Sequence, residues 1–332
     1  MKKAYFYTNY NNIVVLKTYL DVIKSALTNC GYECAYVKSL EGIDRESLIV
    51  HVMGIDAAKY YLKGYTNFIL WQQGATADES FMRNHSKIRY WILNKIDAFA
   101  MKKARFILFV SDYMRHHYEE LAHCSFLDKS YLMPCFNEQL NTQVFKRKNY
   151  AKKTFCYVGS LDLWQCFRET VGLYKSIESK IPNTKLKVLT FDVEKGKQIL
   201  NEFGIVNYEI KQVPKEQVKQ ELIESSYGFI IREDNMVNRV ATPTKFSSYM
   251  SAGVIPIYSS CLIDFDTESK SKNMKYALGL PQMIDMTKII EFINNDVETE
   301  EIQAEYDNLF STYYSENYHA NNIIEQFRKL SI

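Results

Sequence analysis

Two cations in neighbouring segments of this 332-residue chain have the types and spacing of an anion site. In the segment 241–257, Thr242 and Pro243 are typical of a helix start and Gly253 of a helix end. Free N–H groups and the helix dipole attract anions to a helix start, and Lys245 adds a full positive charge in the first turn. The alternative is a well-capped surface helix whose lysine is solvated.

Arg232 directly follows the apolar run 227–231. We therefore expect it at the carboxyl end of a strand, where ligands bind in open parallel sheets. Two cations near one helix start suit a diphosphate better than a carboxylate. The alternative is an arginine that pairs with its neighbours Glu233 or Asp234.

A third polar group follows the apolar run 67–72 in the first half of the chain. Gln73 and Gly74 stand at the end of this expected strand, and Glu79 lies one loop further on. We expect these three residues to contact an acceptor or a sugar. The alternative is a capped turn in which Glu79 serves only the start of the next helix.

Several common chemistries lack their signatures. The seven cysteines and six histidines have no zinc-type spacing, so we expect no metal site. The chain has no Gly-x-Gly-x-x-Gly, no Walker loop and no nucleophile elbow, which disfavours the usual dinucleotide, NTP and hydrolase sites. With 41 basic and 39 acidic residues, the formal charge of +2 predicts no nucleic-acid partner.

Short apolar runs alternate with longer segments of helical spacing, which predicts an α/β architecture. The chain is longer than one hydrophobic core usually spans, so we expect two domains. Residues 137–152 are polar and basic, and we place the boundary there. The expected parts are domain 1–145, domain 146–314 and a terminal helix in 315–332. Expected strands cover 3–8, 32–37, 47–52, 67–72, 106–110, 154–158, 185–190, 208–213, 227–231 and 254–258; expected helices include 14–29, 80–104, 194–203 and 214–225.

The order of these motifs resembles the bacterial glycosyltransferase family four-like enzymes of capsular and cell-surface polysaccharide synthesis. The resemblance covers nearly the whole chain. In the second half it rests on Tyr157-Val158-Gly159-Ser160, Arg232-Glu233, Asn238, Pro243-Thr244-Lys245-Phe246 and Ala252-Gly253-Val254-Ile255-Pro256. In the first half it rests on Leu70-Trp71-Gln72-Gln73-Gly74, Glu79-Ser80 and Phe109-Val110-Ser111-Asp112-Tyr113-Met114.

This resemblance implies a GT-B fold, with two Rossmann-like domains facing each other across a cleft and a terminal helix that crosses back to the first domain. It also implies a UDP- or GDP-linked sugar as donor, retention at the anomeric carbon, and no metal or other cofactor. Arg232 and Lys245 would then be catalytic, because they could stabilise the charge of the departing diphosphate. The implied donor-binding residues are Gly159, Ser160, Val213, Asn238, Pro243, Thr244 and Ser248.

Two positions depart from the family pattern. Ser248 stands where many relatives have a glutamate that binds the ribose, and Val240 stands where another glutamate often contacts the sugar. These departures leave open a catalytically silent GT-B partner protein. A sugar-nucleotide epimerase is a further alternative, but its paired carboxylates and histidine cannot be placed in the sequence.

The segment 81–103 mixes cations with large apolar side chains. Such a face could dock on anionic lipid, where a lipid-linked acceptor would be found. The alternative is a helix that packs its aromatic residues in the core and solvates its cations. Without an apolar run long enough for a signal peptide or a membrane span, we expect a cytoplasmic protein, at the inner face of the membrane if this face docks there.

Overall fold

The computed structural model describes residues 2–8 and 13–332, with the side chains of residues 13–15 outside the description. The chain divides into two compact units. Unit 1 comprises Met1–Cys135, Arg239–Thr242 and Thr312–Ile332, and unit 2 comprises Phe136–Asn238 and Pro243–Ser311.

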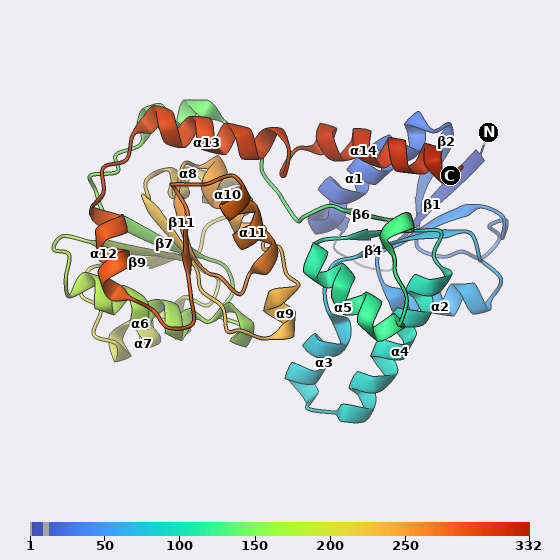
Figure 1. The fold of residues 1–332 in the computed structure, drawn as a ribbon. Coiled ribbons are helices and arrows are strands. Elements are labelled where there is room, and N and C mark those ends of the chain that lie inside the picture. The colour runs from blue at the N-terminus through green and yellow to red at the C-terminus, as the bar shows by residue number, and fades with distance from the viewer. Residues whose placement is uncertain (1, 9–12) are drawn as a thin grey trace. The chain divides into compact units, whose positions relative to one another are not determined.

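Unit 1 is built on a parallel sheet in the order β2-β1-β3-β4-β5-β6. Its last helix, α14, packs against α1 although the two lie at opposite ends of the sequence (Figure 1). Its strands are β1 (Lys2–Tyr7), β2 (Tyr32–Val37), β3 (Leu48–His51), β4 (Phe68–Gln72), β5 (Phe106–Phe109) and β6 (Ser130–Leu132). Its helices are α1 (Ile13–Asn29), α2 (Gly54–Leu62), α3 (Thr76–Asn84), α4 (Lys87–Lys103), α5 (Asp112–Ala122) and α14 (Glu316–Lys329), with a 3-10 turn η1 (Leu127–Lys129).

The prediction of a single long helix over 80–104 is wrong, because the structure has two helices there, α3 and α4. His85 adopts a left-handed conformation with φ 52°, which ends α3. Ser86 then caps α4 by accepting a hydrogen bond from the Arg89 N–H at 3.3 Å. A serine before a basic and apolar run is a helix-start signal that indicates this break.

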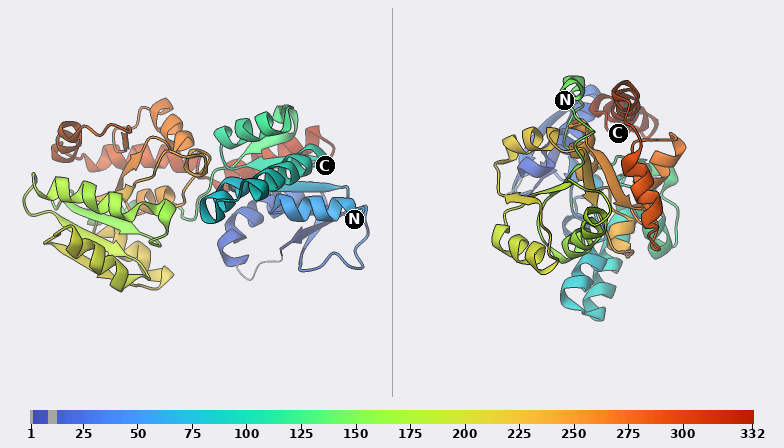
Figure 2. Two further views of the ribbon diagram at one scale, coloured as in Figure 1. Left: turned by 90° about the horizontal axis from the view of Figure 1, so that it is seen from below. Right: turned by 90° about the vertical axis from the view of Figure 1, so that its left-hand side faces the viewer.

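Unit 2 is built on a second parallel sheet, in the order β12-β11-β10-β7-β8-β9. Helices cover both faces of each sheet (Figure 2), which explains why their strands are mostly continuous apolar runs. The strands of unit 2 are β7 (Thr154–Val158), β8 (Lys185–Leu189), β9 (Tyr208–Lys211), β10 (Tyr227–Ile230), β11 (Ile255–Ser259) and β12 (Leu278–Leu280). Its helices are α6 (Phe167–Glu178), α7 (Val193–Glu202), α8 (Lys215–Ile223), α9 (Met236–Arg239), α10 (Lys245–Ser251), α11 (Ile263–Ser271), α12 (Met286–Asn294) and α13 (Thr299–Ser311), with turns η2 (Thr142–Arg147) and η3 (Leu163–Gln165).

Unit 2 begins at Phe136, before the boundary placed at 145/146. Within the polar stretch that suggested this boundary, Val144 and Phe145 are buried. The Phe145 ring lies 6.2 Å from the ring of Tyr306 on α13. These two apolar residues tie η2 to the core of unit 2, which the polarity of the surrounding residues conceals.

Candidate functional site

The sheet of unit 2 reverses its strand order between β7 and β10. From β7 the chain builds outward through β8 and β9, and from β10 it builds in the other direction through β11 and β12. Ligands of doubly wound sheets bind outside the carboxyl ends of the strands at such a switch point. Gly159 follows β7 and Arg232 follows β10 closely, so both residues stand at this point.

Arg232 and Lys245 meet at one oxygen atom, Oε1 of Gln165. Lys245 Nζ donates to it at 2.5 Å, and Arg232 Nη2 donates to it at 2.6 Å. Arg232 Nη1 also donates to the backbone oxygens of Gln165 at 3.1 Å and Ile231 at 2.8 Å. The structure thus brings together the two cations that the sequence suggested, around a glutamine that the sequence did not suggest.

Neither cation forms an ion pair with a carboxylate of the described residues. Arg232 is only 8% exposed, and it does not form the pair with Glu233 or Asp234 that was the alternative. Burial lowers the pKa of Lys245 well below its ordinary value, and repulsion by Arg232 lowers it further. Arg232 is buried and Lys245 is partly exposed but largely desolvated. Desolvated cations without a counter-ion are costly, so this place favours the binding of an anion.

Gly159 allows the backbone to approach Lys245 closely. Its φ is +136°, in the region that favours glycine. A Cβ at this position would lie 3.0 Å from Lys245 Cε and 3.1 Å from Nζ. The Lys245 ammonium also lies 4.6 Å from the centroid of the Tyr157 ring, which gives it a cation–π contact.

The helix that carries Lys245 starts differently from the expectation. Thr244 is the N-cap residue and makes no side-chain cap, and Lys245 is the first helical residue. Thr242 instead accepts a hydrogen bond from the Cys135 N–H at 2.9 Å within unit 1, so its hydroxyl is used elsewhere. The expected helix end is confirmed, since Gly253 follows the C-cap residue with φ +66°.

Ser248 and its neighbour Ser247 both donate to Oδ1 of Asn137, each at 2.9 Å. Asn137 lies in the polar stretch 137–152, in which we place the domain boundary, and no local signal distinguishes it there. Asn238 is buried and donates through Nδ2 to the backbone oxygen of Glu233 at 2.9 Å, which holds the turn after Arg232. This hydrogen bond within the protein accounts for the burial of Asn238, so a ligand is not needed to explain it.

The expected donor-binding residues also include Ser160, Pro243, Thr244 and Val213. Ser160 donates to Asp162 Oδ2 at 2.6 Å, and its backbone oxygen accepts from the Tyr157 hydroxyl at 2.6 Å. Pro243 and Thr244 immediately precede Lys245 and are partly exposed. Val213 is partly exposed and lies between β9 and α8, beyond the β7–β10 switch point.

In unit 1 the structure brings Gly74 and Glu79 together. A Cβ at Gly74 would lie 2.5 Å from Glu79 Oε1, and burial raises the pKa of Glu79. The Gly74 oxygen accepts from Gln72 Nε2 at 2.7 Å and from the Tyr118 hydroxyl at 3.1 Å. Gln73 points instead toward β3, with a 3.4 Å bond from Nε2 to the Val52 oxygen.

A buried carboxyl group that sequence reasoning missed supports this turn. Asp97 on α4 accepts from the Tyr118 hydroxyl at 3.3 Å. Burial raises the pKa of Asp97 to about 7. The same hydroxyl lies 3.1 Å from the Gly74 oxygen, so Tyr118 links Asp97 to the turn.

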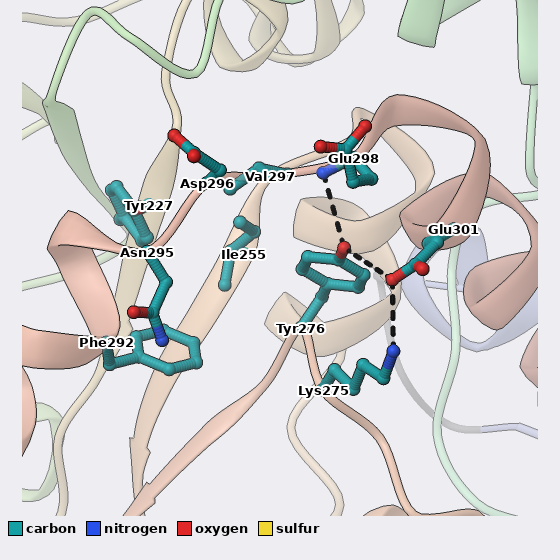
Figure 3. Close-up of a pocket in the computed structure, with 10 residues that line it drawn as sticks. All are labelled: Tyr227, Ile255, Lys275, Tyr276, Phe292, Asn295, Asp296, Val297, Glu298 and Glu301. Atoms are coloured by element: carbon teal, nitrogen blue, oxygen red, sulfur yellow. Dashed lines mark hydrogen bonds and ion pairs between the residues drawn. The ribbon is translucent and has the colours of Figure 1, made fainter.

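A separate pocket of about 320 Å³ lies at the other end of the unit 2 sheet (Figure 3). Tyr227 and Ile255, the first residues of β10 and β11, line it. Its cation Lys275 pairs with Glu301 at 3.1 Å, and Glu301 also accepts from the Tyr276 hydroxyl at 3.1 Å. The only cation among its lining residues is therefore paired, and Asp296 and Glu298 add further carboxylates, so the pocket lacks the uncompensated positive charge found beside Gln165.

Within the described ranges, no three His, Cys, Asp or Glu side chains are grouped as ligands for a metal ion. None of the described helices is both long and apolar enough to cross a membrane.

No family model and no curated protein matches this chain. Among solved structures, WaaG, a glycosyltransferase of lipopolysaccharide biosynthesis, is 10% identical with a TM-score of 0.60, over 97% of this chain and 99% of that one. The lipopolysaccharide outer core galactosyltransferase WaaB is 12% identical with a TM-score of 0.60, over 100% and 99%. S. aureus TarM in complex with UDP is 11% identical with a TM-score of 0.60; the match covers 88% of this chain but only 57% of TarM. The predicted fold class is confirmed: the chain has the GT-B fold of these glycosyltransferases, with two Rossmann-like units.

Proposed function

We propose that this chain is a glycosyltransferase that transfers a sugar from a UDP-linked donor. The observation that carries the proposal is the convergence of Arg232 and Lys245 on one oxygen position without a carboxylate counter-ion among the described residues. The fold supports the proposal, and two of the similar structures are complexes with UDP or UDP-2-fluoro glucose.

The chemistry follows from the charge that develops in the reaction. When the bond between the anomeric carbon and the diphosphate oxygen breaks, negative charge grows on the diphosphate. Arg232 and Lys245 would stabilise that charge through preorganised hydrogen bonds. Each hydrogen bond to a charged group contributes roughly 1.5–3 kcal/mol. Gly159 would let the diphosphate approach the backbone of the turn, and retention at the anomeric carbon is proposed from the family resemblance.

Ser248, Asn238, Val213, Ser160, Pro243 and Thr244 remain the proposed surroundings of the donor. Asn137 joins them, because its side chain holds the Ser248 hydroxyl at 2.9 Å. We propose that this pair contacts the nucleoside where relatives use a glutamate. Gln73, Gly74 and Glu79 of unit 1 remain the proposed contacts of the acceptor or the sugar.

The acceptor is proposed to be a glycan or a lipid-linked molecule of surface polysaccharide synthesis. On α4, Ile88 is 75% exposed and Trp91 62% exposed, so these apolar residues do not pack in the core. Lys95 follows on the same face, with Nζ 5.7 Å from the centroid of the Trp91 ring. Apolar and basic side chains on one helix face support contact with an anionic membrane.

The test is release of nucleotide from a panel of UDP- and GDP-linked sugars. We expect turnover of a UDP-sugar by the wild type and its loss in Arg232→Ala and Lys245→Ala. Arg168→Ala is a matched control, because Arg168 lies on the exposed side of α6 and pairs with Glu202 at 2.7 Å. Wild-type-like turnover in both site variants would refute the assignment of the site.

A second candidate is a catalytically silent partner protein that binds the nucleotide without turnover. Val240 stands where relatives often have a sugar-contacting glutamate, and it is fully buried. UDP binding without turnover of any donor in the panel would favour this candidate.

A further inference from the structure

The side-chain oxygen of Gln165 accepts hydrogen bonds from both cations of the site. Its Oε1 accepts from Lys245 at 2.5 Å and from Arg232 at 2.6 Å, as an oxygen of a bound phosphate would. An amide oxygen is neutral, whereas hydrogen bonds between charged partners are roughly twice as strong as those between neutral ones. A phosphate oxygen therefore satisfies this pair of donors better than Gln165 does.

We propose that Gln165 is an internal occupant of the anion site, which a diphosphate must displace in order to bind. This inference rests on the proposed function, because it takes the diphosphate of the donor as the displacing group. Without donor, the amide oxygen lies between two like charges and satisfies one hydrogen bond of each. On donor binding, the phosphate takes over both bonds.

The segment that carries Gln165 is a short turn that ends in an uncommon backbone conformation. Gln165 is the last residue of the 3-10 turn η3, and the next residue, Cys166, adopts the left-handed conformation with φ 49°. Leu163 in the same turn is 74% exposed. The turn thus has one outward-facing apolar residue and one side chain bonded to the cations, and its end conformation is one that non-glycine residues adopt rarely.

The exchange also explains why a neutral residue suits this position. A glutamate there would pair with both cations and compete strongly with the ligand. A small residue would leave both cations without this acceptor oxygen, which is costly for donors that are largely removed from water. Glutamine holds the two cations in place with bonds that an anion can replace.

The test measures binding of UDP and of inorganic pyrophosphate to the full chain by calorimetry. We expect Gln165→Ala to bind both about 10-fold more tightly than the wild type, because no internal acceptor has to leave. We expect Gln165→Glu to bind both at least about 10-fold more weakly and to melt at a higher temperature without ligand. Gln220→Glu on α8 makes the same charge change at an exposed residue and should alter neither property.

Trp164 supplies an independent readout, since it precedes Gln165 in η3. Pyrophosphate should change the intrinsic fluorescence of the wild type and should change that of Trp164→Phe much less. Equal fluorescence changes in both proteins would contradict a displacement of η3.

The outcomes separate the two claims. If the wild type binds UDP and Gln165→Ala binds it equally or more weakly, Gln165 is a ligand contact or a bystander and the displacement is refuted. If neither the wild type nor Gln165→Ala binds UDP or pyrophosphate, the diphosphate site is refuted together with the proposed function.

Discussion

Replacing Lys245 with methionine should weaken nucleotide binding and stabilise the ligand-free protein. Methionine keeps the length of the side chain beside the Tyr157 ring but removes the ammonium. A hydrogen bond between charged groups contributes about 1.5–3 kcal/mol, which corresponds to a UDP dissociation constant about 10- to 150-fold higher. The stability of the ligand-free protein should rise, because the variant removes a largely desolvated charge that Arg232 repels.

The pH dependence of stability gives the sign of this effect. The pKa of Lys245 is lowered in the folded state, so between that pKa and its ordinary value of 10.5 the unfolded state binds more protons. The free energy of unfolding therefore rises with pH across this window in the wild type. In Lys245→Met, the free energy of unfolding should rise less with pH across this window, because the lysine that titrates is gone.

Calorimetry with UDP and thermal melts at several pH values measure both effects. Lys180→Met is the matched control, because Lys180 is an exposed lysine two residues after the end of α6. An unchanged dissociation constant for UDP in Lys245→Met would refute the role of the ammonium. A lower melting temperature without ligand would refute the claim that its charge is uncompensated.

Three further predictions concern pH and single residues. UDP affinity should fall as pH rises through the lowered pKa of Lys245, because a bound diphosphate raises that pKa again; calorimetry in buffers of different ionisation enthalpy should detect proton uptake on binding. Gly159→Ala should cost about 1–3 kcal/mol of stability by chemical denaturation and weaken UDP binding, because φ +136° is strained for alanine and its Cβ would crowd Lys245; an unaltered UDP affinity would contradict the close approach. The pKa of Asp97 is raised from 3.8 to about 7, so between these pH values the folded state holds a proton that the unfolded state has lost, and the free energy of unfolding should fall as pH rises. Thermal melts of Asp97→Asn should show a smaller fall across this window, and a fall equal to that of the wild type would contradict the raised pKa.

Long apolar runs explain why much of the fold could be predicted from the sequence. Phe106–Phe109 and Tyr227–Ile230 are buried strands of four residues with no charged side chain. The strands β6 and β12 were missed because each has only three residues, most of them partly exposed. The break between α3 and α4 was missed because His85 is not a residue that usually marks a left-handed helix end.

The candidate site could be predicted only as far as charge and strand ends reveal it. Arg232 and Lys245 carry charge beside an apolar strand and at a helix start, which local patterns indicate. Gln165 is neutral and lies in a short irregular turn, and only the folded chain shows that its oxygen faces both cations. Asn137 was missed for the same reason, since its contact with Ser248 joins segments that are far apart in the sequence.

A crystal structure of the chain with UDP would show whether Arg232 and Lys245 bind the diphosphate. We expect oxygens of the diphosphate to lie within hydrogen-bonding distance of Lys245 Nζ and the Arg232 guanidinium, beside the Gly159 backbone, with the Gln165 side chain displaced. A diphosphate bound elsewhere, for example in the pocket lined by Tyr227 and Lys275, with Gln165 still bonded to both cations, would contradict it.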